Sequence, residues 1–161
     1  MQREELPVEV ENALDAIEFE GMLMGRQMSP QNHPEHTVLS LDRSAYTLMS
    51  RIEIDGPLSI PQMSAAFALD ASTLNRQTAA MMRKDLIRRI PDPDGGIARK
   101  FELTPHGMEL LEGDRDIKRR GLRTILAAWS AEEVTTFAAL LHRFNSDVEA
   151  REGRPWPRPT H

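Results

Sequence analysis

The sequence has no cysteine among its 161 residues. This absence excludes disulfide bonds, thiolate metal sites, cysteine nucleophiles and thiol-based redox sensing. There is also no apolar run near the roughly 18 residues that a membrane-spanning helix needs. The N-terminus is acidic and amphipathic and does not have the basic and apolar segments of a signal peptide. We therefore expect a cytoplasmic protein that makes no membrane contact.

The usual arrangements of catalytic and metal-binding residues are missing as well. We find no glycine-rich phosphate loop, no Ser/His/Asp set with a nucleophile elbow and no Glu-x-x-His helix. His33 and His36 lie close together in sequence, but Glu35 is the one carboxylate beside them, so we interpret them as solvated loop residues rather than metal ligands. The sequence thus predicts neither an enzyme nor a bound metal or cofactor.

The overall composition is ordinary, but the charged residues are unevenly distributed along the chain. The chain is 40% hydrophobic and 28% charged, as in globular proteins generally, and its length suits one domain or a small domain with long helical extensions. Residues 71–100 hold seven basic and three acidic side chains, a net charge of +4, which leaves −9 for the rest of a chain whose total is −5. Such a segment is typical of a nucleic-acid contact, although a solvated basic surface would have the same charge.

The central region predicts three helices followed by a hairpin. A helix over residues 41–52 stops at Asp55-Gly56-Pro57, Ser59 can cap a short helix, and Asp70 can cap a longer one. On the longer helix Leu74, Thr78 and Met81 share one side, and the opposite side is polar. This is the arrangement of a helix-turn-helix. Strand-like runs at 86–90 and 97–103, separated by the turn-forming residues 91–96, predict a hairpin of the kind called a wing.

The two ends of the chain have the periodicity of amphipathic helices. Apolar or small residues between positions 6 and 28 repeat at spacings of four and three. Thr104 is placed to cap a helix that runs to about Ala128. Ser130, with Glu133 completing a capping box and Trp129 able to pack on Val134, starts another helix that runs to about Arg151. The remaining proline-rich residues predict an extended, mobile tail.

This order of elements resembles the MarR family of bacterial transcriptional regulators. The similarity is strongest in residues 56–107, GPLSIPQMSAAFALDASTLNRQTAAMMRKDLIRRIPDPDGGIARKFELTPHG, and extends over about 140 residues. It rests on Asp70, Ser72, Thr73, Arg76, the wing entry Asp92-Pro93 and the wing exit Leu103-Thr104 with Gly107. The resemblance implies a mainly α fold: a winged helix-turn-helix domain with a two-stranded β wing, and N- and C-terminal helices that form a dimerisation region.

We accordingly divide the chain into four parts. Residues 1–37 are expected to form an N-terminal dimerisation helix and loop, and residues 38–104 the winged helix-turn-helix DNA-binding domain. Residues 105–151 are expected to form C-terminal dimerisation helices, and residues 152–161 a flexible tail.

The longer helix of the helix-turn-helix has the side chains that a major-groove reader needs. Short polar residues at its N-terminus suit phosphates or base edges, and Arg, Asn or Gln beyond them can reach bases. The basic residues farther along suit phosphates, which position a protein without specifying sequence. The predicted DNA contacts are Ser72, Thr73, Asn75, Arg76, Gln77, Arg83, Arg88, Arg89, Arg99 and Lys100. The alternative is that Arg76 and Arg83 merely solvate an exposed helix.

The sequence departs from the family pattern in the wing and just before it. Family members often carry an Asp-x-Arg pair at the wing tip, where the Asp fixes the loop and the Arg enters the minor groove. The aligned positions here are Gly95 and Ile97. Arg99 or Lys100 could replace that arginine, or the wing could touch the DNA backbone only. Asp85 stands where the family usually has Gly, and Asp tolerates the left-handed conformation expected there.

A homodimer would hold two DNA-reading helices, one from each subunit. These two readers would match a palindromic operator, whose successive major-groove faces are about 34 Å apart. The alternative is that the terminal stripes fold back into one monomeric core. In the family, the first, fifth and sixth helices form the dimer. The predicted interface residues are Val10, Leu14, Ile17, Val134, Phe137, Leu141, Phe144 and Val148.

The resemblance also implies a small aromatic or anionic effector that binds one spacing of the readers better than another. Methionines such as Met22, Met24, Met28 and Met49 could line its pocket, or they could fill the core.

The sequence therefore favours a sequence-specific regulator that binds double-stranded DNA, a homodimeric repressor relieved by a small molecule. The competing hypothesis is a winged-helix module that has lost DNA readout and binds another protein. The altered wing and the net acidity motivate that second reading.

Overall fold

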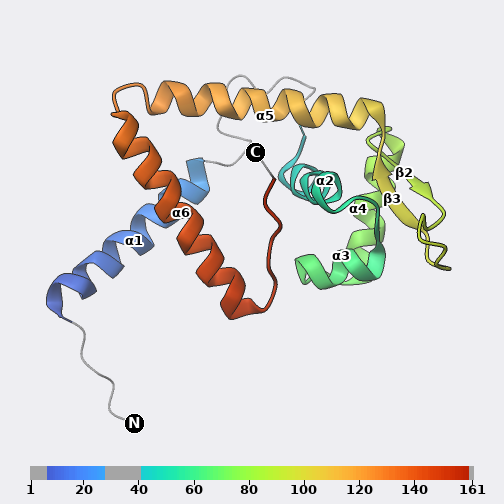
Figure 1. Cartoon of the computed structure of the whole chain (residues 1–161), viewed down its shortest axis with the longest axis horizontal. Helices are drawn as coiled ribbons and strands as arrows, with labels where there is room; N and C mark the ends of the chain where they lie inside the picture. The colour runs from blue at the N-terminus through green and yellow to red at the C-terminus, as the bar shows by residue number, and fades with distance from the viewer. Residues whose placement is uncertain (1–6, 28–40, 160–161) are drawn as a thin grey trace, which may run out of the picture. The chain divides into compact units, whose positions relative to one another are not determined.

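The computed structural model describes residues 7–27 and 41–159, and the structural statements below concern these residues. Figure 1 shows the helices and the small sheet. The elements are α1 (Val8–Gln27), α2 (Arg43–Asp55), β1 (Leu58–Ser59), α3 (Ile60–Phe67), α4 (Ala71–Arg83), β2 (Ile87–Ile90), β3 (Lys100–Leu103), α5 (Pro105–Ile125) and α6 (Ala131–Glu152). Helix α1 belongs to one compact unit and the elements from α2 onward belong to a second. The structure confirms the mainly α winged-helix fold.

The core of the second unit lies where α2, α3, α4 and α5 meet the sheet. Its side chains come from every one of these elements, so each helix is held by burial of one apolar side. The buried hydrophobic residues are Leu41, Ala45, Leu48, Met49, Ile52, Leu58, Met63, Leu74, Met81, Leu86, Ile87, Phe101 and Leu111. Met49 is fully buried in this core, whereas Met22 and Met24 on α1 are exposed. Met28, His33 and His36 lie outside the described residues.

The helix starts predicted from the sequence are confirmed. The Ser59 hydroxyl accepts a bond from the Gln62 amide at 3.4 Å, and the Gln62 side chain accepts one from the Ser59 amide at 2.8 Å. Ser130 and Glu133 form the second capping box, at 3.2 and 2.7 Å. Capping of this kind satisfies amides that a helix end leaves unpaired. Trp129 makes its edge-to-face ring contact with Phe137, at 5.7 Å between ring centroids.

The sheet differs from the prediction in two ways. It has three antiparallel strands in the order β1-β3-β2, with Leu58 opposite Phe101 and Arg89 opposite the same residue on the other side. Strand β1 has two residues, too few to show the period-two alternation that marks a strand in sequence. Residues 97–99 were expected in a strand, but β3 begins only at Lys100. The turn is longer because Asp92 accepts hydrogen bonds within it.

The segment after α6 makes contacts that the sequence did not predict. Residues 154–159 belong to no helix or strand, and they contact the rest of the unit; their mobility stays a prediction. The Trp156 ring meets Phe67 edge to face at 5.4 Å, and the Arg51 guanidinium lies 5.0 Å from the Trp156 ring centroid. The proline content indicated a segment without helix, but it did not indicate that the tryptophan would supply apolar surface for contacts with the rest of the unit.

The junction between α4, the wing and α5 is closely packed. Asp85 has a φ of 54°, so it adopts the left-handed conformation expected at this position. The Thr104 hydroxyl accepts from the Gly107 amide at 2.9 Å as the cap of α5, and it donates to the carbonyl of Asp85. A Cβ on Gly107 would lie 2.0 Å from the carbonyl oxygen of Leu86. Only glycine lets α5 approach the backbone that follows α4 this closely.

We predict that Gly107→Ala lowers the free energy of unfolding by about 2 kcal/mol, because the new methyl group forces the backbone of Leu86 and α5 apart. Urea denaturation followed by circular dichroism measures this change. Gly113→Ala is the matched control, since a Cβ there meets nothing within 4 Å and alanine is the better helix former. Equal stability of the two variants would contradict the close packing.

Candidate nucleic-acid interface

Helix α4 divides cleanly into a buried side and an exposed side. Leu74, Thr78 and Met81 are 0%, 1% and 3% exposed, so the side predicted to face the core does face it. The Thr78 hydroxyl donates to the carbonyl of Leu74 at 2.8 Å, which satisfies the one polar group on that side. Ser72, Asn75, Arg76 and Arg83 are exposed, whereas Thr73 and Gln77 are half-buried.

The N-terminus of α4 is fixed by Asp70. One Asp70 carboxylate oxygen accepts from the Thr73 amide at 2.8 Å and from the Ser72 hydroxyl at 2.5 Å, and the other accepts from the Thr73 hydroxyl at 2.8 Å. These bonds, led by that from the Ser72 hydroxyl, hold the pKa of Asp70 far below its usual range. The hydroxyl protons of Ser72 and Thr73 are therefore donated to Asp70. Toward DNA these hydroxyls can accept hydrogen bonds, but they can donate one only by breaking the bond to Asp70.

Arg76 and Gln77, two of the predicted base readers, have different surroundings. The Arg76 guanidinium donates to the Thr73 hydroxyl at 3.3 Å and stays on the exposed side of α4. The carbonyl oxygen of Gln77 is buried and has no hydrogen-bond partner among the described residues. Because a two-point contact with adenine uses both ends of the amide, Gln77 must change rotamer before it can make one.

The basic residues of β2 are partly engaged within the sheet. Arg88 pairs across the strands with Glu102 at 2.6 Å, and its side chain is still 64% exposed. The Arg89 guanidinium lies 5.7 Å from the ring centroid of Phe101. Arg99, in the turn before β3, is exposed. Arg99 is thus open to solvent, whereas any other partner of Arg88 would compete with Glu102 for its guanidinium group.

Lys100 is placed differently from the expectation, because it is buried. Its ammonium group lies 2.8 Å from Asp92 and 3.1 Å from Asp94, and the residue is 8% exposed. The hydrogen bond to Asp92, followed by that to Asp94, raises the pKa of Lys100, and the same bond lowers the pKa of Asp92. Lys100 therefore braces the wing, and its charge is neutralised before any phosphate could use it. Sequence spacing does not indicate this arrangement, because only the folded turn brings both carboxylates to the ammonium group.

The wing tip is shaped by the same ion pairs. The Asp94 amide donates to the Asp92 carboxylate at 3.0 Å, and a Cβ on Gly96 would lie 2.2 Å from that carboxylate. Gly95 has a φ of +81°, which L side chains rarely adopt. Beyond this braced turn Ile97 projects into solvent with full exposure. An apolar side chain thus occupies the position of the wing arginine that the family pattern leads one to expect.

Neither a metal centre nor a membrane segment is found in the described part of the chain. Among residues 7–27 and 41–159, no group of three or more His, Cys, Asp or Glu side chains is arranged to hold a metal ion. No helix in these ranges has the length and apolarity to cross a bilayer.

Comparison with known proteins identifies the family. The sequence matches no protein-family model. It is 33% identical over 135 residues to YxaD, an uncharacterized HTH-type transcriptional regulator of Bacillus subtilis (strain 168), covering 84% of this chain and 94% of that protein. Among solved structures, the fold matches a MarR family protein from Bacillus stearothermophilus with a TM-score of 0.65 and 21% identity, over 92% of this chain and 99% of that one. The chain belongs to the HTH-type transcriptional regulators, and its fold is that of MarR family proteins.

A second structural match is to a protein that was solved with DNA. A mutant MarR from E. coli, solved in complex with operator DNA, shares the fold with a TM-score of 0.64 and 15% identity, over 83% of this chain and 96% of that one. The relative YxaD is a transcriptional regulator and not an enzyme, and the same role holds for this chain. The individual DNA contacts and the partner subunit remain proposals for this chain.

We predict that Lys100→Gln accelerates hydrogen exchange of the wing amides, because Asp92 and Asp94 then repel each other without a cation between them. The amides of Asp94 and Gly95, which donate to Asp92, should respond most. Hydrogen–deuterium exchange with mass spectrometry gives the measurement. Arg99→Gln, which removes the same charge from an exposed neighbour, is the control and should leave exchange unchanged. Identical exchange in both variants would show that Lys100 does not brace the wing.

Proposed function

We propose that the chain is a homodimeric repressor that binds a palindromic operator in double-stranded DNA. The observation that carries this proposal is the exposed polar side of α4, held by burial of Leu74, Thr78 and Met81 and by the Asp70 cap. A rigid helix with an exposed polar face fits the major groove, where each base pair presents its own pattern of donors and acceptors. A dimer seated on a palindrome near a promoter would block transcription from it.

Contacts along this surface would divide into two kinds. Arg76 and Asn75, both exposed on α4, are proposed to read base edges. Arg83, Arg88, Arg89 and Arg99 are proposed to bind phosphates on either side, which fixes the register of the helix in the groove. At the wing tip, Ile97 would contribute apolar contact and no charge.

We predict that Arg76→Ala weakens binding to the operator about tenfold, because a bidentate contact to a base is lost. Fluorescence anisotropy with a labelled duplex from the protein's own upstream region, against a scrambled duplex at the same salt concentration, gives the measurement. Arg119→Ala is the matched control, since Arg119 is an exposed arginine on α5 that pairs with Glu112 and Asp116. Unchanged affinity in the Arg76 variant would instead favour the protein-interaction module.

The dimer is supported by apolar surface that the single chain leaves uncovered. Neither α1 nor α6 has a buried residue. On α1, Val10, Leu14 and Ile17 are 42%, 46% and 57% exposed. The exposed apolar residues of α6 and the turn before it are Trp129, Phe137, Leu140, Phe144 and Val148, with Val134 and Leu141 half-buried. Exposed patches of this kind mark protein contacts.

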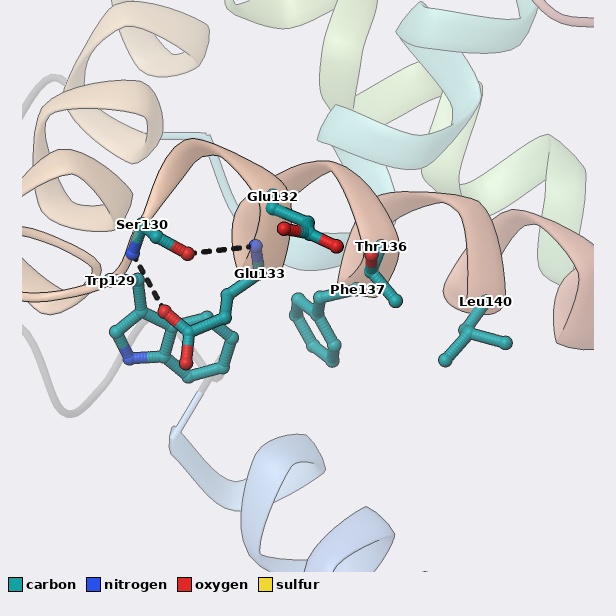
Figure 2. A pocket seen from close by; sticks show the side chains of 7 residues that line it. All are labelled: Trp129, Ser130, Glu132, Glu133, Thr136, Phe137 and Leu140. Carbon is teal, nitrogen blue, oxygen red and sulfur yellow. Dashed lines mark hydrogen bonds between the residues drawn. The ribbon is translucent and has the colours of Figure 1, made fainter.

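Figure 2 shows how this surface begins at the N-terminus of α6. Trp129 and Phe137 lie next to each other on one side of the helix, and Leu140 extends the same side by a turn. With Thr136 and the capping residues they line a shallow, mostly apolar groove. Leu140 was absent from the predicted interface, because it lies beside the regular stripe and not in it. We propose that a second copy of the chain covers this side of α6 together with the stripe on α1.

We predict that Phe144→Glu converts the dimer to a monomer at micromolar concentration, because a carboxylate would be buried without a partner in the interface. Light scattering coupled to size-exclusion chromatography reports the mass. Ala139→Glu, an exposed position on the other side of α6, is the control and should remain dimeric. A dimer that survives the Phe144 substitution would remove α6 from the interface.

The proposal includes a small aromatic or anionic effector. Its support is the dimeric arrangement itself, in which a molecule that binds one spacing of the two α4 helices better than another shifts the population away from the DNA-binding spacing. By linkage, operator binding would weaken binding of that molecule by the same factor.

A further inference from the structure

We propose that the C-terminal segment Arg154–Pro159 is a strap that fixes the orientation of α6 relative to the DNA-reading helices, with Trp156 as its positioning residue. The segment begins at Gly153, whose φ of 66° turns the chain back on itself at the end of α6. In Figure 1 it runs from α6 toward α2 and α3. The inference rests on the proposed dimer, in which α6 meets the partner.

One end of the strap is held by α6. The Glu149 carboxylate accepts from the Trp156 amide at 2.9 Å and from the Arg158 guanidinium at 2.6 Å. Arg158 also donates to the carbonyl of Trp156 at 2.5 Å, which closes a compact turn around the tryptophan backbone. These bonds set the direction in which the indole leaves α6.

The part of the strap around Trp156 also contacts α2 and α3. The Trp156 ring meets Phe67 edge to face, with ring centroids 5.4 Å apart and the ring planes at 71°. Arg51, on α2, lies 5.0 Å from the same ring and donates to the carbonyl of Pro155 at 3.3 Å. Arg51 is itself held by Asp55 at 2.5 Å. The indole is thus clasped by a ring on one neighbour and by a fixed cation on another.

Phe67 has a particular place in the helix-turn-helix. It is the last residue of α3, directly before Ala68, whose φ of 52° makes the turn into α4. The Ser64 hydroxyl donates to the carbonyl of Leu69 at 2.6 Å and closes that turn. The strap therefore attaches α6 to the residue from which the path of α4 begins. Besides this attachment, α6 joins the same lobe along the chain through α5.

In a dimer, this attachment has a consequence for DNA. The partner subunit fixes the position of α6, and the strap fixes α3 relative to α6. The position of α3 sets that of α4, so the distance between the two α4 helices depends on the strap. A dimer without it would sample several spacings, and its affinity for two half-sites would fall by the fraction of time spent at the correct one. Each α4 alone would still bind a single half-site as before.

The test uses the full-length protein with Trp156→Ala and two duplexes, the palindrome from its own upstream region and the same duplex with one arm randomised. We expect binding to the palindrome to weaken about tenfold and binding to the one-armed duplex to stay unchanged. Arg154→Ala is the control, because Arg154 lies in the same segment and pairs with Glu152, outside the clasp. It should behave as the wild type on both duplexes.

A second readout does not depend on DNA. Because the chain has no cysteine, Lys84→Cys gives a single spin-label site at the end of α4, and the distance between two labels reports the spacing in the dimer. Trp156→Ala should broaden that distance distribution. Arg158→Ala removes the arginine's bonds to Glu149 and to the Trp156 carbonyl but keeps the indole. It should broaden the distribution in the same direction, and it covers the case in which the tryptophan variant does not fold.

The outcomes separate this inference from the proposed function. If the wild type binds the palindrome no better than the one-armed duplex, the dimeric repressor itself is wrong. If the wild type prefers the palindrome but Trp156→Ala keeps the wild-type affinity and distances, the strap is wrong. If that variant loses affinity equally for both duplexes while the spin-label distances stay unchanged, Trp156 merely stabilises the lobe and the positioning role is wrong.

Discussion

Burial of one side of α4 is the constraint on which the rest of the molecule depends. Leu74 and Met81 lie in the core with Thr78 between them. The Thr78 hydroxyl is hydrogen-bonded inside its own helix, so this polar group keeps a partner when this side of α4 is buried. The remaining side is therefore presented to solvent in one orientation. Asp70 adds a fixed starting point, because its carboxylate holds the first turn through three hydrogen bonds.

Much of this could be predicted from the sequence because it is decided locally. Ser59 and Gln62, or Ser130 and Glu133, lie three residues apart, and the capping box they form needs nothing from the rest of the chain. The division of α4 follows from the helical period of its apolar residues. The left-handed residue after α4 was also predictable, since Asp85 belongs to the few residue types that tolerate such a φ.

What could not be predicted depends on partners that are distant in sequence or defined only by the fold. Strand β1 exists because Leu58 pairs with Phe101, and two residues carry no pattern of their own. Trp156 is anchored by α2 and α3, with Arg51 bonded to a carbonyl 104 positions away, so a proline-rich tail was expected where a packed segment is found. Lys100 and Asp92 are near in sequence, but only the folded turn brings their charges together. Composition gives the charges and leaves open which of them neutralise each other.

This last point alters how the protein would attract DNA. Of the seven basic side chains of residues 71–100, Lys100 is paired with Asp92 and Asp94, and Arg88 is paired with Glu102. Each neutralised phosphate adds a fixed increment to the dependence of affinity on salt, so fewer free cations mean a weaker and less salt-sensitive attraction. In the proposed dimer, an acidic chain whose wing carries an exposed isoleucine would depend more on base contacts by α4 and on the spacing of the two α4 helices. When the electrostatic attraction to DNA is weak, a rigid spacing raises the affinity most. A dimer with the wrong spacing loses contacts at one half-site, and a weak electrostatic attraction does not compensate for that loss.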